Sequence, residues 1–367
     1  MRLDRVDRRT ALVYGGYATA FVLLALAKVA GLPALPVFFL AVIALAAGAV
    51  AVGEATTKLS HRLSPAATGV VQSVLGNLPE LFLAIFALQA GLNGVVAAAL
   101  VGSVLGNVLF VLGLALMVGG VRHGLLQFSR AANNLYATVL LLGVAALVVP
   151  FLATQIGAPD FGHAAELSAV VAVTLLVIFA ISIPISLRLP QAGPGSRPEL
   201  DDVEGESARA HGPLAPTILL LAVSAGSSAF VADWFVEALR PAMATIGMSE
   251  AFAGLIVVAI AGNAVENLVA LSAAWQNRAD LSLSLVLNSA LQIVLFLAPV
   301  VVLLSFIVAP APLTLVFSPL LLGALAVSVV LVFAIVLDGE ANALEGAMLL
   351  GLYVIIAAAV WWGPPIS

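Results

Sequence analysis

Eleven apolar runs of about 20 residues, separated by short polar segments, make up most of this 367-residue sequence. A helix of about 20 residues spans the hydrocarbon core of a bilayer. Only 9% of the residues are charged, whereas about a quarter are charged in a soluble domain. We therefore predict an all-α integral membrane protein in a lipid bilayer, with eleven transmembrane helices. The expected spans are 11–29, 35–52, 66–90, 95–118, 135–152, 167–187, 215–236, 251–274, 281–307, 313–337 and 344–362.

The cations of the connecting segments favour one orientation. If the N-terminus lies in the cytoplasm, twelve Lys and Arg residues lie on the inside and only Lys28 and Arg240 on the outside. Cytoplasmic loops carry such an excess, so we expect the C-terminus outside. Short loops and an Ala- and Gly-rich composition fit a prokaryotic inner membrane. The sequence has no basic patch, so nucleic acid is not an expected partner. Its oligomeric state is not indicated.

Two of the apolar runs contain a Gly-Asn pair followed by a glutamate. The first reads Gly76-Asn77-Leu78-Pro79-Glu80, and the second reads Gly262-Asn263-Ala264-Val265-Glu266. A charged residue at the centre of a membrane helix costs roughly 2.5–3.5 kcal/mol on insertion scales. A single such glutamate can be a structural hydrogen-bonding group, but a repeated pair favours a function.

The two phrases belong to an internal repeat with an offset of 186 residues. From Gly76 to Phe110, ten of 35 positions are identical in the second copy, including the Gly, Asn and Glu of the phrase and Ser103/Ser289. Five helices per half would place the two copies in opposite orientations, which is the inverted-repeat plan of secondary transporters. The expected parts are an N-terminal segment with the first helix (1–33), a first half (34–189), an acidic cytoplasmic linker (190–213) and a second half (214–367). The linker is either a solvated tether or a cation-collecting, regulatory segment.

The residue types of the two phrases predict a cation site where helices are interrupted. Gly76, Pro79 and Gly262 weaken a helix, and Pro79 leaves the carbonyl of Leu75 without its usual donor. Irregular backbone at membrane depth is tolerated only where it faces protein or a wet cavity. The candidate metal and proton ligands are the carboxylates Glu80 and Glu266. The other candidate ligands are Asn77, Asn263, Ser103, Asn107, Asn288, Ser289 and Gln292.

This set offers only oxygen ligands, which suit Ca²⁺ better than softer metals. The two serines have an alternative role, because small residues also permit close helix packing. Two further acids, Glu54 and Asp233, lie outside the expected centre, and each is an entrance candidate or an ordinary interfacial acid.

Two carboxylates can neutralise one divalent ion. Without the ion, desolvation and mutual repulsion would favour their protonated forms. Metal and protons would therefore compete for the same oxygens, which predicts an antiporter that needs no cofactor. The alternatives are exchange of Na⁺, K⁺ or Mn²⁺ for protons, and a passive cation channel. An enzyme is not expected, because the sequence has no Cys and all four His lie outside the expected spans.

These motifs resemble those of the calcium/proton exchangers of the calcium/cation antiporter superfamily. The resemblance rests on Gly-Asn-x-x-Glu in both halves, on residues 288–292 (Asn-Ser-Ala-Leu-Gln), on the acidic linker, and on residues 338–340 and 344–348. It implies an extra first helix before two five-helix halves, and export of cytosolic Ca²⁺ driven by inward protons. It also implies that Glu80 and Glu266 carry the cation and protons. The sequence departs from the family at Asn267, where His is frequent, and at Pro79, where a small residue is more common.

Overall fold

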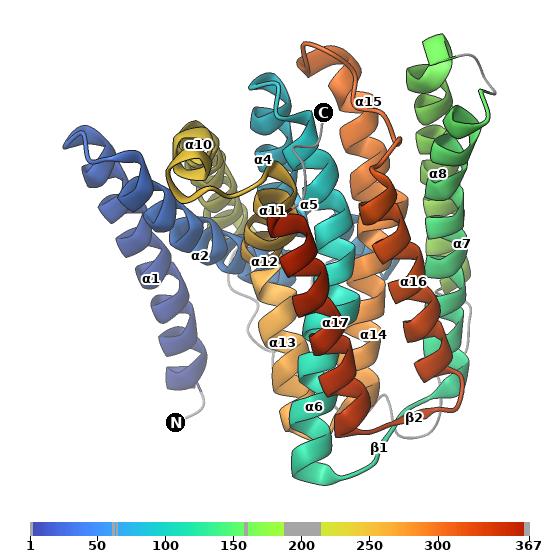
Figure 1. The fold of residues 1–367 in the computed structure, drawn as a ribbon. Helices are drawn as coiled ribbons and strands as arrows, with labels where there is room; N and C mark the ends of the chain where they lie inside the picture. Colours follow the sequence, from blue (N-terminus) through green and yellow to red (C-terminus); the bar gives the residue numbers. More distant parts are fainter. Residues whose placement is uncertain (1–2, 61–62, 64, 158–160, 187–213, 363–367) are drawn as a thin grey trace.

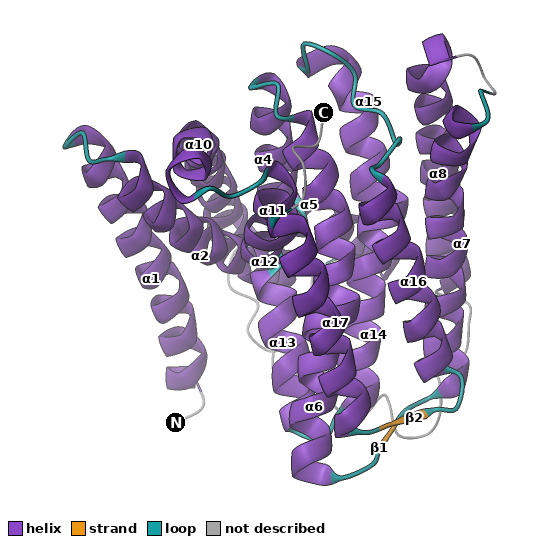
Figure 2. Ribbon diagram, viewed as in Figure 1, coloured by secondary structure: helices purple, strands orange, loops and turns teal. Residues whose placement is uncertain are grey.

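The computed structural model describes residues 3–60, 63, 65–157, 161–186 and 214–362, which form a bundle of helices (Figures 1 and 2). In the first part of the chain the elements are α1 (Leu3–Val29), α2 (Ala34–Ser60), α3 (Pro65–Gly76), α4 (Leu78–Gln89), α5 (Asn93–Leu105), the π-helical segment η1 (Gly106–Val111), α6 (Leu112–His123), β1 (Leu126–Gln127), α7 (Arg130–Gln155), the 3₁₀ turn η2 (Phe161–His163) and α8 (Ala164–Ser186). The second part contains α10 (Leu214–Ile246), α11 (Glu250–Phe252), the π-helical segment η3 (Ala253–Val258), α12 (Ala259–Gly262), α13 (Ala264–Trp275), α14 (Ala279–Gln292), the π-helical segment η4 (Ile293–Leu297), α15 (Ala298–Val308), α16 (Pro319–Val336), β2 (Glu340–Ala341) and α17 (Ala343–Trp361).

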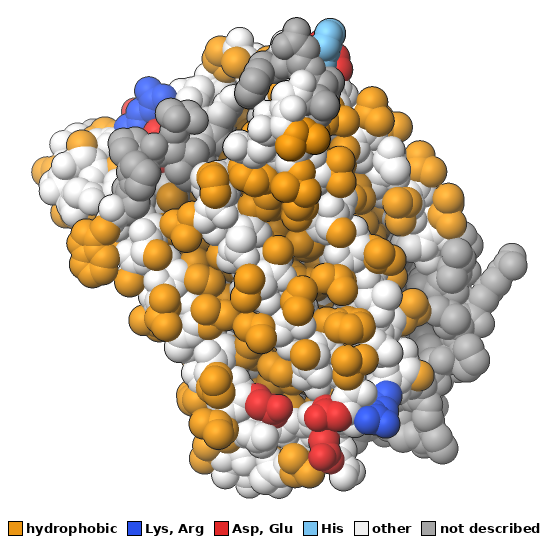
Figure 3. Space-filling model, turned by 45° about the vertical axis from the view of Figure 1, so that its right-hand side comes forward, with side chains coloured by type: hydrophobic (Ala, Val, Ile, Leu, Met, Phe, Trp, Pro, Cys, Tyr) orange, Lys and Arg blue, Asp and Glu red, His pale blue; other side chains and the backbone are white. Residues whose placement is uncertain are grey.

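The prediction of an all-helical integral membrane protein is confirmed. Within the described residues, nine helices are long and apolar enough to cross a bilayer, and residues 250–262 with 264–275 form a bent pair that counts as a tenth. The predicted span 66–90 is divided between α3 and α4, which have twelve residues each. Figure 3 shows apolar side chains across the middle of one face and charged side chains near its two ends.

Several helix ends differ from those expected. Helix α2 continues to Ser60 and α10 to Ile246, so Glu54 and Asp233 lie within helices and not at their ends. Helix α16 begins at Pro319 rather than at residue 313. The residues before it are irregular, and two of their N–H groups donate to serines: Leu313 N to Ser305 Oγ (2.8 Å) and Leu315 N to Ser168 Oγ (2.9 Å). The expected linker lies outside the described residues.

A small antiparallel sheet joins the two parts of the chain at one end of the bundle. Strand β1 lies between α6 and α7, and it pairs with β2, which lies between α16 and α17. In Figure 1 this sheet lies at the same end as the start of α1, whereas α17 ends at the opposite end. The ends of the described chain therefore lie on opposite sides of the bundle.

Close backbone contacts hold α5 against η3. A Cβ on Gly102 would lie 2.3 Å from Leu255 Cα, and a Cβ on Gly254 would lie 2.3 Å from Val95 O. Glycine permits this approach, as small residues commonly do between membrane helices. The first part of the chain is thus packed backbone to backbone on the second, immediately beside the interrupted helices.

Candidate functional site

Both Gly-Asn pairs interrupt a helix at the same point. Helix α3 ends at Gly76 and α4 begins at Leu78, while α12 ends at Gly262 and α13 begins at Ala264. The intervening residues have similar backbone angles, with φ −93° and ψ 14° at Asn77 and φ −87° and ψ 22° at Asn263. The second break bends the chain by 65°. The predicted interruptions are therefore present in both parts of the chain.

The asparagine side chains satisfy backbone carbonyls at the breaks. Asn77 Nδ2 donates to Ser73 O (2.7 Å), and Asn263 Nδ2 donates to Ala259 O (2.9 Å), four residues earlier in each case. Pro79 is one of the three residues predicted to weaken a helix here, and the second break forms with Val265 at the matching position. Pro79 lies in the first turn of α4, where a helix tolerates proline.

Two π-helical segments flank the site at nearly equivalent positions of the repeat. Segment η1 begins at Gly106, and η4 begins at Ile293, one residue after the counterpart of Gly106. A π-helical turn accommodates an extra residue and is frequent at functional sites. Here the turns follow directly on the helices that carry Ser103 and Ser289. The apolar sequences of these segments gave no sign of π-helix.

Asn107 is the centre of a buried polar network between the two parts of the chain. Its Nδ2 atom lies 2.9 Å from Ser103 O, 3.1 Å from Ser289 Oγ and 3.4 Å from Asn263 Oδ1. Asn263 Nδ2 in turn donates to Ser103 Oγ (3.1 Å). Four predicted site residues therefore lie in mutual contact, although 156 residues separate Asn107 from Asn263.

A second contact between the two parts joins Asn77 to Gln292. Asn77 Nδ2 donates to Gln292 Oε1 at 3.4 Å. Each Asn of the two phrases thus contacts a side-chain amide from the other part of the chain: Asn77 contacts Gln292, and Asn263 contacts Asn107. Asn107 and Gln292 are not equivalent positions of the internal repeat. Each nevertheless lies next to the start of a π-helical segment, Asn107 in η1 and Gln292 just before η4.

The two glutamates lie at the same junction. A Cβ on Gly262 would meet Glu80 Cγ at 2.9 Å and Glu80 Oε1 at 3.0 Å, so the Glu80 side chain lies directly on the second break. Glu80 is also within electrostatic range of Glu266. Both side chains are half-buried. The structure therefore brings the two predicted carboxylates to a single place.

Three buried oxygens, two of them on residues of the site and one on the neighbour of Glu266, accept no hydrogen bond from the described residues. They are Glu80 Oε2, Asn107 Oδ1 and Asn267 Oδ1. A buried acceptor without a donor is costly, so these oxygens are available to a cation, and the carboxylate oxygen of Glu80 is also available to a proton. Asn267 was not among the predicted site residues, although its position beside Glu266 was a signal that it could contribute.

The remaining candidates do not join this network. Asn288 is exposed, and its neighbour Ser289 makes the contact with Asn107 instead. Glu54 lies 3.5 Å from Lys58 on the same helix, and Asp233 is exposed on α10. Asn288 therefore lies outside the network of Asn107 in this structure, and its role as a cation ligand stays a prediction.

The donor set of the junction fits hard cations. In the described part of the chain, no cluster of three or more His, Asp or Glu residues could hold a metal. A cation bound here would take two carboxylates and complete its shell with amide, hydroxyl and carbonyl oxygens. Ca²⁺ accepts such a mixed oxygen set.

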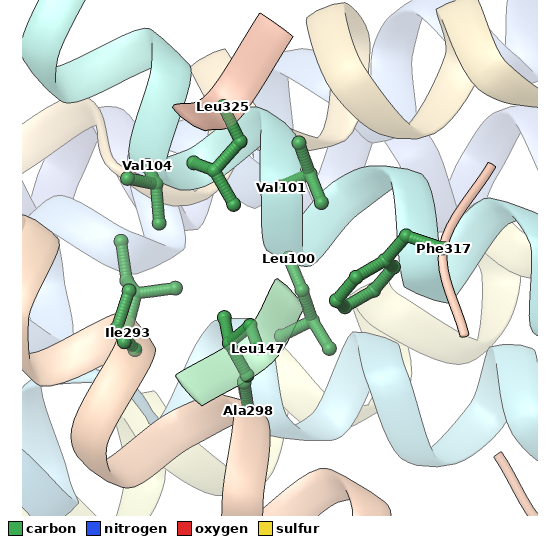
Figure 4. A pocket seen from close by; sticks show the side chains of 9 residues that line it. Leu100, Val101, Val104, Leu147, Ile293, Ala298, Phe317 and Leu325 are labelled. Carbon is green, nitrogen blue, oxygen red and sulfur yellow. The ribbon is translucent and has the colours of Figure 1, made fainter. Parts of the chain in front are cut away.

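A separate small cavity near η4 is unsuitable for ions. It is lined only by apolar side chains, including Val104, Leu147, Ile293 and Phe317, which point toward one another in Figure 4. A charged ion there would have no ligand to replace its water.

Comparison with known proteins decides the family. The family model described as "Sodium/calcium exchanger protein" matches residues 33–188 and 216–362, which is most of the chain. The chain belongs to the sodium/calcium exchanger family. The resemblance to calcium/proton exchangers that the motifs indicated is confirmed, and the family comprises antiporters rather than enzymes.

Several members of the family are similar to this exchanger over nearly their whole length. A "Ca(2+)/H(+) antiporter" of Synechocystis sp. is 34% identical over 342 residues, covering 89% of this chain and 91% of the relative. The "Ca(2+)/H(+) antiporter ChaA" of Bacillus subtilis is 33% identical, covering 88% and 90%. The structure of native YfkE has a TM-score of 0.80 at 28% identity, covering 95% and 99%.

Proposed function

We propose that this family member is a Ca²⁺/H⁺ antiporter in which Glu80 and Glu266 alternately hold Ca²⁺ and protons. The observation that carries the proposal is the meeting of two carboxylates from opposite parts of the chain, beside buried oxygens that lack donors. The Synechocystis and Bacillus relatives are named as Ca²⁺/H⁺ antiporters, which supports this choice of ions.

The mechanism rests on competition for the same oxygens. A bound Ca²⁺ ion offsets the charge of both carboxylates, and protons offset it when the ion leaves. A site with both carboxylates ionised and no ion would be costly at membrane depth. The site therefore switches between the two sides of the membrane mainly when it holds Ca²⁺ or protons. This condition couples the movement of Ca²⁺ in one direction to the movement of protons in the other.

The inverted-repeat arrangement gives this site two routes of access. In Figure 1, α4 leads from its break toward one end of the bundle, and α13 leads from its break toward the other. The matching breaks and π-helical segments, and the two stretches matched by the family model, support two equivalent halves. We further propose eleven crossings, with α3 and α4 together forming one of them.

We also propose a cytoplasmic N-terminus and export of Ca²⁺ from the cytosol. Arg122 and Arg130 flank β1 and Arg278 precedes α14, at the end of the bundle where α1 begins. This distribution follows the positive-inside rule.

Proteoliposomes with an acidic interior test the function. Native protein should accumulate Ca²⁺ against its gradient until the pH gradient collapses, which a passive channel cannot do. Glu80→Gln and Glu266→Gln should each lower uptake to the level of empty vesicles. Glu166→Gln, an exposed carboxylate on α8, is the matched control and should retain native uptake. Undiminished exchange in both site variants would refute the assignment.

The description of the family model supports a second candidate, exchange of Ca²⁺ for Na⁺. The same vesicles distinguish it. A Na⁺ gradient imposed at equal pH on both sides should drive no Ca²⁺ uptake if protons are the coupling ion. Mn²⁺ and K⁺ are tested as competitors in the same assay.

A further inference from the structure

A surface groove lies between α6 and α13 at the end of the bundle that carries the β1–β2 sheet. It has a volume of about 370 Å³ and is lined by Val118, Leu268, Leu271, Ser272 and Trp275. Leu268 is 61% exposed and Trp275 54% exposed. Four of the five lining side chains are apolar, so the groove offers nothing to a hydrated cation and is separate from the ion site.

A fixed cation lies at one end of this groove. The guanidinium carbon of Arg122 is 4.2 Å from the centre of the Trp275 ring, a stacking geometry that holds the charge in place. The His123 ring lies beside it, and its Nε2 must donate to the Trp275 carbonyl (3.0 Å), because a carbonyl oxygen only accepts. Arg122 is exposed and forms no ion pair with any described residue. No described residue accepts a hydrogen bond from it, so its N–H donors can face an anion.

The surroundings place this cation at the boundary of the bilayer. Val121 is 77% exposed and Leu125 53% exposed, so apolar side chains project on both sides of Arg122. Trp275 is the last residue of α13, and tryptophan is enriched where membrane helices reach the headgroups. The apolar groove therefore points into the hydrocarbon layer, and the guanidinium lies at headgroup level.

We propose that this groove is a binding site for an anionic phospholipid. One acyl chain lies along Leu268 and Leu271, and the headgroup phosphate accepts hydrogen bonds from Arg122. Charge complementarity selects the headgroup, because basic positions between membrane helices recognise anionic lipids. The proposal does not depend on which ions the protein exchanges.

Quenching of Trp275 fluorescence tests the proposal. The full chain with Trp234→Phe, Trp361→Phe and Trp362→Phe retains only Trp275 of its four tryptophans. It is reconstituted into vesicles of phosphatidylglycerol and phosphatidylcholine in which one lipid or the other carries brominated chains. We expect brominated phosphatidylglycerol to be enriched at Trp275 about fivefold over its bulk fraction, the effect of one favourable charge near a membrane surface.

Two charge variants complete the test. Arg122→Gln should remove the enrichment, whereas Arg240→Ala, at the opposite end of the bundle, should leave it unchanged. Equal quenching by the two brominated lipids would overturn the headgroup preference. An absence of quenching by either would mean that protein, such as a second copy of this chain, covers the groove, and would also overturn the proposal. If the triple variant does not fold, the difference between native protein and Trp275→Phe gives the same readout.

Discussion

The Glu80 side chain lies directly against Gly262, so the carboxylate of the first repeated phrase touches the helix break of the second. A Cβ at Gly262 would come within 2.9 Å of Glu80 Cγ, inside the range that real contacts avoid. The equivalent glycine in the first phrase, Gly76, has open space around the same position. The two breaks are therefore alike in backbone geometry but different in what they face.

Gly262→Ala is expected to reduce transport strongly, because the new methyl group must displace the Glu80 carboxylate. A displacement of about 1 Å at a reacting group commonly costs about 100-fold, and we expect a loss approaching that size in the Ca²⁺ uptake rate. Gly76→Ala should cost far less, since its methyl group meets nothing within 4 Å. Equal losses in the two variants would contradict this account of the junction.

The sequence was sufficient to locate the breaks but not to explain them. Gly-Asn inside an apolar run predicted an interrupted helix at both places, and both are present. Pro79 was the more obvious helix breaker, yet the break at Asn263 forms without one. The asparagine side chain, by donating to a carbonyl four residues earlier, is the feature that the two breaks share.

Contacts between distant residues were beyond the reach of sequence patterns. Asn107 and Gln292 are not equivalent in the repeat, and their roles follow from π-helical segments whose apolar residues carry no recognisable signal. The sequence also did not indicate which of two adjacent polar side chains is exposed: Asn288 is exposed, whereas Ser289 contacts the network. The length of α10 was missed because the run of apolar residues ends before the helix does.

Asn107→Ala should destabilise the protein by about 1–3 kcal/mol, the cost of leaving buried polar groups unpaired. The change removes the donor that Asn263 Oδ1 and Ser289 Oγ share. Thermal unfolding in detergent measures the loss, and Asn288→Ala is the control one residue from Ser289, with an expected change within about 0.5 kcal/mol. A stable Asn107→Ala variant with native uptake would show that the network is dispensable.

Gly102→Ala should disrupt the packing of α5 on η3. The added methyl group would lie 2.3 Å from Leu255 Cα, and because this neighbour is backbone it cannot rotate away. Overpacking of this kind costs about 1–3 kcal/mol or more. Gly106→Ala, four residues later in the chain, meets nothing within 4 Å and is the matched control. The yield of monodisperse protein in size-exclusion chromatography should fall for the first variant and not for the second.

Asp280 links the start of α14 to the start of α7, and its loss should weaken the end of the bundle that carries the sheet. Its Oδ1 atom accepts from Ser129 N and, at 3.1 Å, from Asn133 Nδ2. Ser129, the N-cap residue before α7, makes no capping bond with its own side chain, and Asp280 from the other part of the chain accepts its N–H instead.

Asp280→Ala should lower the free energy of unfolding by about 1–3 kcal/mol, because both donors lose their acceptor. Asp280→Asn retains an acceptor oxygen but loses the charge that favours a helix N-terminus. Its free energy of unfolding should therefore fall by less, about 0.3–1 kcal/mol. Thermal unfolding compares the stability losses of the two variants, and Asp338→Ala, at an exposed carboxylate, is the control. If Asp280→Ala unfolds at the same temperature as native protein, the bonds that Asp280 accepts from α7 and its N-cap do not stabilise the fold.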